Sequence, residues 1–191
     1  MESVEKNFAY IDSNNLHRGI KNLGWEIDYK KFRVWLSEKY NVTEAYTFIG
    51  LIPKNKSIYT QLQKIGFSLI FKEVVYFGKG EVKGNCDAEL VLNCTRDVFE
   101  RKEDFDKIII VAGDGDYACL IEFLRDENKL KIVLSPTASP KKDRGKKKDK
   151  CSILIKKLNI PIVYLGDKRS ILEKQDLEVE KEKAPDADET A

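Results

Sequence analysis

The stretch IIIVAGDGDYACLIEFL, residues 108 to 124, decides the fold of this chain. Its first four residues are β-branched and apolar, which is typical of a central parallel strand buried on both faces. The strand ends at Gly113, and apolar residues recur at helical spacing after Tyr117, so a helix is predicted to begin close to Asp116. Asp114 and Asp116 therefore lie where a buried strand leads into a helix, the edge at which open parallel sheets bind ligands.

These two carboxylates carry like charges two residues apart, and partial burial of both is unfavourable without compensation. A helix N-terminus stabilises an anion by about 0.3–1 kcal/mol. A divalent cation held by oxygen ligands is the other candidate. The structural alternative is that Asp114 closes a glycine-rich turn and Asp116 only caps the helix. The segment alone leaves both interpretations open.

Length and composition indicate one globular domain with a heavily charged surface, since 191 residues include 42% hydrophobic and 35% charged side chains. No apolar run approaches the roughly 18 residues that span a bilayer, and the N-terminus lacks a signal-peptide pattern. The 4 cysteines are scattered without a C-x-x-C pair, which favours buried thiols over a zinc site. We expect a cytoplasmic protein with no membrane partner.

The charge is unevenly distributed along the chain. Residues 173–191 hold eight acids and three bases, so the net charge of +2 leaves +7 on residues 1–172. A basic body suits a polyanionic partner, with a solvated charged surface as the alternative. We expect a domain over residues 1–170 that includes a basic loop at 137–150. Residues 171–191 are expected to form an acidic, partly disordered extension.

The first strand repeats the pattern of the central one, because NFAYI at 7–11 leads through Asp12 into a helical stripe. Further strands are expected at 42–51, 67–77, 130–134 and 160–165, with a glycine-hinged loop or hairpin after 77. Helices are expected between them, including one that ends at Gly66 and buries Ile58. This alternation predicts a three-layer α/β/α sandwich with a mainly parallel central sheet, Rossmann-like in topology. Neither G-x-G-x-x-G after the first strand nor G-x-x-x-x-G-K-[ST] occurs, which argues against nucleotide-cofactor and P-loop sites.

Four aspartates follow strands or begin a helix, namely Asp12, Asp87, Asp114 and Asp116. If the first and central strands are neighbours, the four carboxylates meet at one crevice, which favours a magnesium or manganese site. Such a site suits phosphodiester hydrolysis. His17 is the single histidine, so nucleophilic catalysis with a histidine base would have to use it. An exposed helical position is the alternative for His17.

Three motifs occur in order: YIDSNNL at 10–16, KGNCD at 83–87 and AGDGDY at 112–117. Over about residues 7–165 the chain resembles NYN domains, in particular the LabA-like branch of the PIN-like nuclease superfamily. The resemblance implies a PIN-like α/β/α sandwich and an acidic pocket that binds divalent metal. For many members it also implies ribonuclease activity.

Carried over by motif, the resemblance implies that Asp12, Asp87, Asp114 and Asp116 are the catalytic and metal-binding acids. It implies that Asn15 orients substrate or a ligand carboxylate. Relatives often have a further aspartate about six residues after Asp87, where this chain has Asn93. An amide oxygen at Asn93 can contact a ligand or substrate but brings no charge.

Further substrate contacts are predicted from charge and aromatic residues. The loop at 141–150 has seven Lys and Arg residues, including Lys146 and Lys147, and such a loop could hold phosphates without reading sequence. Lys83 is a second candidate for phosphate binding, and Tyr117 a candidate for stacking on a base. A solvated charge run and a buried aromatic are the respective alternatives.

The leading hypothesis is a Mg2+- or Mn2+-dependent ribonuclease, a hydrolase that acts on single-stranded or flexible RNA through the aspartates. The second is a catalytically weak NYN-fold module that binds RNA or protein, favoured by Asn93. A phosphatase is a third, although the D-x-D-x-[TV] pattern is absent at Asp12. The sequence leaves the oligomeric state open between a monomer and a homodimer.

Overall fold

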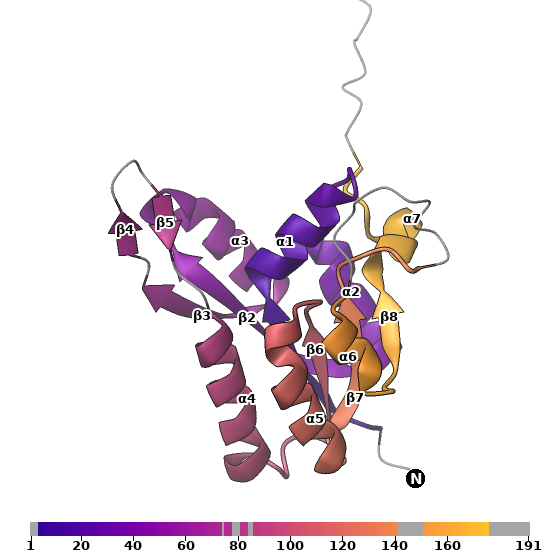
Figure 1. Cartoon of the computed structure of the whole chain (residues 1–191). Helices are drawn as coiled ribbons and strands as arrows, with labels where there is room; N and C mark the ends of the chain where they lie inside the picture. Colours follow the sequence, from indigo (N-terminus) through magenta and orange to yellow (C-terminus); the bar gives the residue numbers. More distant parts are fainter. Residues whose placement is uncertain (1–3, 74, 78–80, 84–85, 141–150, 176–191) are drawn as a thin grey trace, which may run out of the picture.

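The computed structural model describes residues 4–73, 75–77, 81–83, 86–140 and 151–175 (Figure 1). Its centre is a six-stranded parallel sheet of order β3-β2-β1-β6-β7-β8. These strands are β1 (Asn7–Asp12), β2 (Val42–Leu51), β3 (Ser68–Glu73), β6 (Lys107–Val111), β7 (Leu130–Ser135) and β8 (Ile162–Tyr164). A separate antiparallel hairpin pairs β4 (Val75–Phe77) with β5 (Glu81–Lys83).

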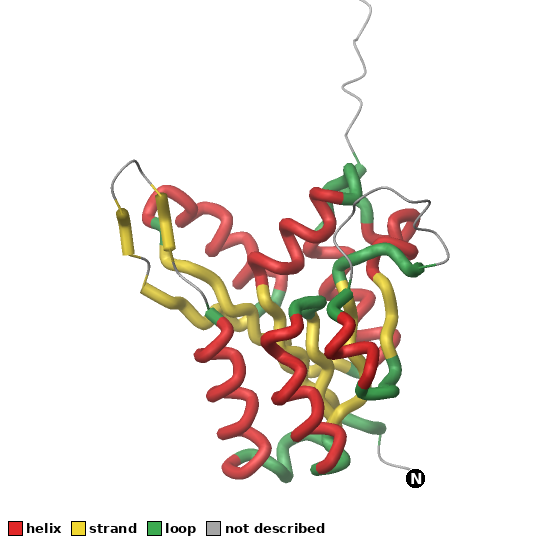
Figure 2. Tube along the Cα trace, viewed as in Figure 1, coloured by secondary structure: helices red, strands yellow, loops and turns green. Residues whose placement is uncertain are grey.

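Helices connect and cover these strands (Figure 2). The α-helices are α1 (Ser13–Asn22), α2 (Tyr29–Tyr40), α3 (Lys56–Ile65), α4 (Asp87–Glu100), α5 (Ala118–Asp126), α6 (Ile153–Lys157) and α7 (Arg169–Leu172). Three short 3-10 helices complete the set: η1 (Pro53–Asn55), η2 (Gly115–Tyr117) and η3 (Leu165–Lys168). Among the described helices, none has the length and apolar character that crossing a membrane requires.

The central strand is β6, as its β-branched run predicts. Ile108, Ile109, Ile110 and Val111 are all 0% exposed, because helices cover both faces of the sheet. β6 pairs directly with β1 in parallel register. The condition on which convergence of the aspartates depends, that the first and central strands are neighbours, is therefore met.

Alternate residues of β1 and β6 point into two separate hydrophobic cores. Phe8, Tyr10, Ile108 and Ile110 belong to the core under α4, α5 and α6. Ala9, Ile11, Ile109 and Val111 belong to the core under α1, α2, α3 and α7. This strict alternation follows from the two-residue period of a strand. The result is the predicted α/β/α sandwich, with α4, α5 and α6 side by side on one face (Figure 1).

The chain leaves β1 and β6 in opposite directions across the sheet. From β1 the strand order proceeds outward to β2 and β3, whereas from β6 it proceeds outward to β7 and β8. The carboxyl ends of β1 and β6 therefore flank the point where the strand order reverses, which is the usual ligand site of such sheets.

Two details differ from the sequence-based expectations. The run at 67–77 is divided, since β3 ends at Glu73 and the hairpin strand β4 begins at Val75. Ile58 of α3 is 48% exposed, whereas the neighbouring Tyr59 is 6% exposed and packs inward. The helical phase of α3 is thus set by the aromatic residue, which buries more surface than isoleucine.

The C-terminal boundary of the packed body lies beyond residue 170 within the described part. Leu172 is 0% exposed and belongs to the core under α1, α2 and α3. Glu173 forms an isolated antiparallel bridge with Ile27. The predicted basic loop at 141–150 and the acidic residues 176–191 lie outside the described residues.

Candidate active site

A crevice of about 1150 Å³ opens at the carboxyl ends of the central strands. All four predicted aspartates line it, as does the predicted Asn15. Most other residues at its walls come from α1, the end of β2, α3 and the turns after β6 and β7, and Tyr29 at the start of α2 and Ser152 before α6 also line it. The strand–carboxylate–helix pattern therefore brings these side chains to one edge of the sheet.

Asp12 is the last residue of β1 and the N-cap of α1. Its Oδ1 atom accepts a hydrogen bond from the backbone N–H of Asn15 at 2.9 Å. An aspartate followed by short polar residues is a strong N-cap, because its carboxylate satisfies a free N–H of the first turn. The cap fixes the carboxylate at the crevice, where it is only 8% exposed.

Tyr117 joins Asp12 to Asp87 through its hydroxyl group. This oxygen lies 2.9 Å from Oδ2 of Asp12 and 2.5 Å from Oδ1 of Asp87. A phenol has a single hydrogen to donate, so it can satisfy one of the two carboxylates at a time. The two acids therefore compete for one donor in a largely buried setting.

The pKa values of Asp12 and Tyr117 reflect this competition. Burial raises the pKa of the Asp12 carboxyl and the charge of Asp87 adds to the rise, while hydrogen bonds from Asn15 and Tyr117 oppose it. Burial and the two neighbouring carboxylates raise the pKa of the Tyr117 phenol, so it remains a hydrogen-bond donor. Ionised Asp12 is thus destabilised relative to an aspartate in water, and a cation would reverse that effect.

Asp114 and Asp116 form a second, more exposed pair. Asp114 caps η2, and its Oδ1 atom lies 3.4 Å from the backbone nitrogen of Asp116, which donates to it. The turn is linked to the first strand by Asn15, whose Oδ1 accepts a hydrogen bond from the Gly113 N–H at 2.9 Å. Asn15 therefore holds the two acidic turns together as well as lining the crevice.

The donor set fits a hard divalent cation. In the ranges that the structure describes, no three His, Cys, Asp or Glu side chains lie close enough to hold one metal ion. Asp12 and Asp87 instead meet as a pair at one hydroxyl group. Mg2+ is commonly held by one or two carboxylates, with water and substrate phosphate oxygens as its other ligands. A pair of aspartates in a wide crevice meets that requirement.

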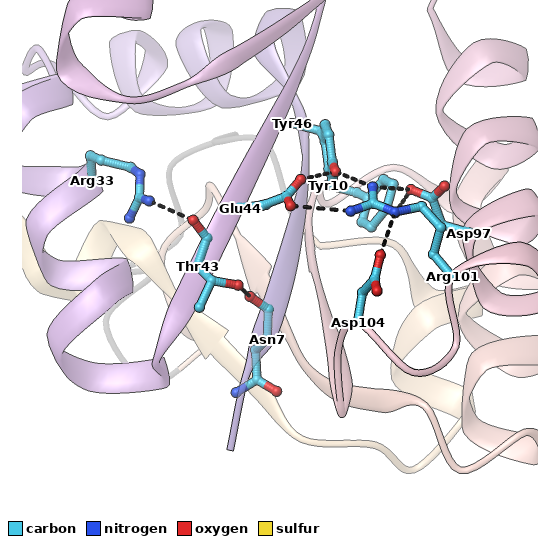
Figure 3. Close-up of polar contacts among 9 residues, drawn as sticks. All are labelled: Asn7, Tyr10, Arg33, Thr43, Glu44, Tyr46, Asp97, Arg101 and Asp104. Carbon is cyan, nitrogen blue, oxygen red and sulfur yellow. Dashed lines mark hydrogen bonds and ion pairs between the residues drawn. The ribbon is translucent and has the colours of Figure 1, made fainter. Parts of the chain in front are cut away.

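Helix α4, which carries Asp87, is anchored to the sheet by a partly buried polar network (Figure 3). The Tyr10 hydroxyl on β1 donates to Oδ2 of Asp97 at 2.5 Å. Arg101 donates to the Tyr46 hydroxyl at 2.5 Å and to Oε1 of Glu44 at 3.1 Å. These bonds connect one helix to two adjacent strands and so set the position of the helix along the sheet.

Two predicted substrate contacts are placed differently by the structure. The Tyr117 side chain is 0% exposed, so its ring has no free face for a base, and its hydroxyl contacts Asp12 and Asp87 instead. Asn93 does not line the crevice. Its amide donates to the Glu89 carbonyl at 2.7 Å and accepts from Arg96 at 3.0 Å, both on its own helix.

The predicted phosphate-binding lysines are not described. Lys146 and Lys147 lie outside the described residues, and the side chain of Lys83 is not described either. The chain re-enters the described structure at the crevice, because Ser152 lines it and donates its N–H to the Gly113 carbonyl at 2.9 Å.

The sequence-based reasoning missed one basic residue of the crevice, Arg18. It is exposed, lines the crevice, and makes no hydrogen bond or ion pair with any residue that the structure describes. His17 also lines the crevice and is exposed. The sequence contains a signal for both residues. They follow the Asp12 cap by less than two turns of a helix, and Leu16 and Ile20 mark the inner face of that helix.

Comparison with known proteins gives a family match, a related sequence and a solved structure of the same fold. The family model described as the NYN domain matches residues 8–154. The low amplitude and bright protein LabA of Synechococcus elongatus is 26% identical over 136 residues, which is 66% of this chain and 71% of that protein. A crystal structure of a Vibrio parahaemolyticus protein of unknown function has a TM-score of 0.68 at 22% identity. The match covers 90% of this chain and 99% of the Vibrio chain, and it shows a shared fold.

Proposed function

Because this chain belongs to the NYN domain family, we propose that its crevice hydrolyses phosphodiester bonds of single-stranded or flexible RNA with the help of Mg2+ or Mn2+. The observation that carries the proposal is the approach of Asp12 and Asp87 to one phenolic hydroxyl in a crevice that Asp114 and Asp116 also line. Carboxylates that share one donor bind a cation readily, since the cation offsets their mutual repulsion.

Asp12 and Asp87 are the residues that would hold the cation. When bound, a divalent cation supplies Lewis-acid polarisation of the phosphate, a lower pKa for water and neutralisation of charge. Tyr117 keeps the two carboxylates together by hydrogen bonding. Asp114 and Asp116, exposed at the crevice wall, are placed to accept a proton from water or to hold a further cation.

The proposed substrate follows from the charge and shape of the crevice. Arg18 presents an unpaired guanidinium to the same space, as judged from the described residues, and a guanidinium binds phosphate through two parallel hydrogen bonds. A crevice of about 1150 Å³ that is open to solvent suits a flexible strand, whose phosphates can reach the acids.

The test is cleavage of labelled single-stranded RNA by the purified full chain with Mg2+ or Mn2+. We expect cleavage that disappears on chelation and falls by about 100-fold or more in Asp12→Asn and Asp87→Asn, since loss of even an outer-shell partner of a metal typically costs about 10–100-fold. Asp126→Asn is the matched control, because Asp126 is exposed at the end of α5 and lies outside the crevice. Cleavage that is equal in all three variants would point to a contaminating nuclease and overturn the proposal.

A second candidate is an RNA-binding module with weak chemistry. It is favoured by the arrangement of the acids in two pairs, since no three of them within the described ranges gather around one point. Salt-sensitive RNA binding without metal-dependent cleavage would support this alternative over hydrolysis.

A further inference from the structure

A second cavity, of about 310 Å³, lies between α1, α2 and α3. Its size is at the lower end of ligand pockets in proteins and suits one nucleoside rather than a larger ligand. The apolar part of its wall comes from Ile20, Trp25, Ile27 and Ile65. Trp25 is 6% exposed, so it forms a fixed surface of the cavity.

The cavity lies next to the crevice of the aspartates, because His17 and Tyr29 line both. The outer face of α1 runs between them. Asn14, His17 and Arg18 line the crevice, while His17 and Lys21 line the cavity. The four side chains recur at intervals of three and four residues, which places them on one side of a helix, and all four are exposed.

The charged groups of the cavity favour a neutral ligand that belongs to an anionic chain, because both acids have partners within the described ranges and Lys21 has none there. Its basic residues are Lys21, Lys30 and Lys174, and its acids are Glu26 and Asp28. The Asp28 carboxylate is occupied by the N-cap of α2, where it accepts backbone hydrogen bonds at 2.9 and 3.0 Å. Glu26 lies 3.8 Å from the Lys174 ammonium group. Lys21 remains without a partner among the described residues.

Tyr29, in the wall that the cavity shares with the crevice, supplies a polar group as well. Tyr29 contacts Phe67 edge to face, with ring centroids 6.3 Å apart. Its hydroxyl makes no hydrogen bond to any residue in the described ranges. A phenol in this position can donate to, or accept from, the edge of a base.

We propose that the cavity between α1, α2 and α3 is a subsite for one base of the RNA strand, and that Arg18 and Lys21 bind the phosphates between this base and the aspartates. The inference rests on the proposed function for the nature of the strand. It also specifies the path of the RNA, which crosses the outer face of α1. It also adds a length requirement, since an RNA too short to span α1 cannot fill both sites.

The test uses Trp25 as a reporter in the full chain. The chain has two tryptophans, and Trp35→Phe leaves Trp25 alone while keeping an aromatic ring beside Phe32 and Tyr40. Fluorescence of this variant is titrated with an RNA dinucleotide and an RNA octanucleotide in buffer without divalent cations, so that no cleavage intervenes. Binding of both RNAs is followed in parallel by anisotropy of a terminal dye.

We expect saturable quenching of Trp25 by the octanucleotide and much weaker quenching by the dinucleotide. Adding Lys21→Glu should weaken octanucleotide binding by about tenfold, because it removes one phosphate contact and places an acid beside the RNA. Lys102→Glu is the matched control, because Lys102 is exposed in the turn after α4 and lines neither cavity nor crevice.

Octanucleotide binding that leaves Trp25 fluorescence unchanged would overturn the subsite, as would equal weakening by the two lysine variants. The outcome is separable from that of the proposed function. Metal-dependent cleavage without a Trp25 response would remove the subsite alone, whereas a Trp25 response without cleavage would remove the proposed hydrolysis alone.

Discussion

At the scale of single residues, the chemistry of the site depends on two carboxylates that share one hydroxyl. Asp12 and Asp87 come from a strand end and a helix start that are 75 residues apart in the sequence. Tyr117 is the contact between them, with O–O distances of 2.9 and 2.5 Å. Burial removes the water that would screen the charges of the two acids, so their approach to one hydroxyl requires a hydrogen-bond donor, a proton or a cation.

Tyr117→Phe removes this donor and leaves the ring in place. We expect the free energy of unfolding to fall by about 1–3 kcal/mol in metal-free buffer, the range for a buried polar group that loses its partner. Mn2+ should restore part of the loss, because a cation can replace the hydroxyl between the carboxylates. Urea denaturation with and without Mn2+ measures both effects. An unchanged stability, or a loss that Mn2+ does not reduce, would contradict the assigned role of Tyr117.

Residue roles were predicted unevenly from the sequence. The four aspartates could be identified because each follows a strand or begins a helix, and the structure brings them to one crevice. The role of Tyr117 could not, since its burial depends on α4 lying over the turn. That packing is a tertiary contact which no local pattern encodes.

At the scale of elements, the position of α4 on the sheet decides where its first carboxylate lies. A helix can slide along a sheet unless specific contacts fix it, and here the fixing contacts are polar (Figure 3). Asp97 is 7% exposed and accepts from Tyr10 of β1. Arg101 reaches β2 and also lies over the Phe8 ring, 4.9 Å from its centroid. The network thus fixes α4 near its C-terminal end, more than two turns from Asp87.

Tyr10→Phe tests this anchor. The substitution removes the hydrogen bond from Tyr10 to the buried Asp97 carboxylate, which keeps its longer ion pair with Arg101 at 3.7 Å. We therefore expect a loss of about 1–3 kcal/mol in the free energy of unfolding. Tyr164→Phe is the control, because the Tyr164 hydroxyl is partly buried but has no hydrogen bond to the described residues, and its loss should stay within about 0.5 kcal/mol. The two variants are compared by urea denaturation. Equal stabilities would show that the anchor contributes nothing.

A second contact fixes α1, which lines the crevice. A Cβ atom added at Gly19 would lie 2.3 Å from the Pro136 carbonyl oxygen and 2.9 Å from its Cβ. Alanine favours a helix over glycine by about 1 kcal/mol, whereas overpacking costs about 1–3 kcal/mol. The overlap is with backbone, so we expect Gly19→Ala to lower the thermal midpoint. A higher midpoint would mean that the Pro136 loop moves freely away from α1.

The elements themselves were largely predictable. The β-branched run at 108–111 predicted a buried central strand, and the passage from NFAYI through Asp12 into a helical stripe predicted the start of α1. The run at 67–77 was predicted as one strand because β-branched and aromatic residues continue through it. Its division between β3 and a hairpin depends on where the neighbouring strand β2 ends, at Leu51, and a single segment does not contain that information.

At the scale of the whole molecule, the charge is divided between a basic body and an acidic C-terminal stretch. Residues 1–172 carry +7 and residues 173–191 carry −5. The binding of RNA by the body should therefore depend strongly on ionic strength, because cations are released from the nucleic acid as lysine and arginine replace them. The basic residues of α1 are the part of this charge that lies beside the aspartates.

Arg18→Ala tests the contribution of the crevice to this electrostatic binding. Loss of one phosphate contact should reduce the slope of log Kd against log salt by about 1 and weaken binding to different RNA sequences by similar factors. Titrations at several salt concentrations give the slope. An unchanged slope would place Arg18 outside the path of the RNA.

Anomalous diffraction from crystals soaked in Mn2+ would show whether Asp12 and Asp87 form a cation site. We predict a manganese peak between these two carboxylates in the crevice. The absence of a peak there in well-diffracting crystals, or a peak only at unrelated surface acids, would contradict it.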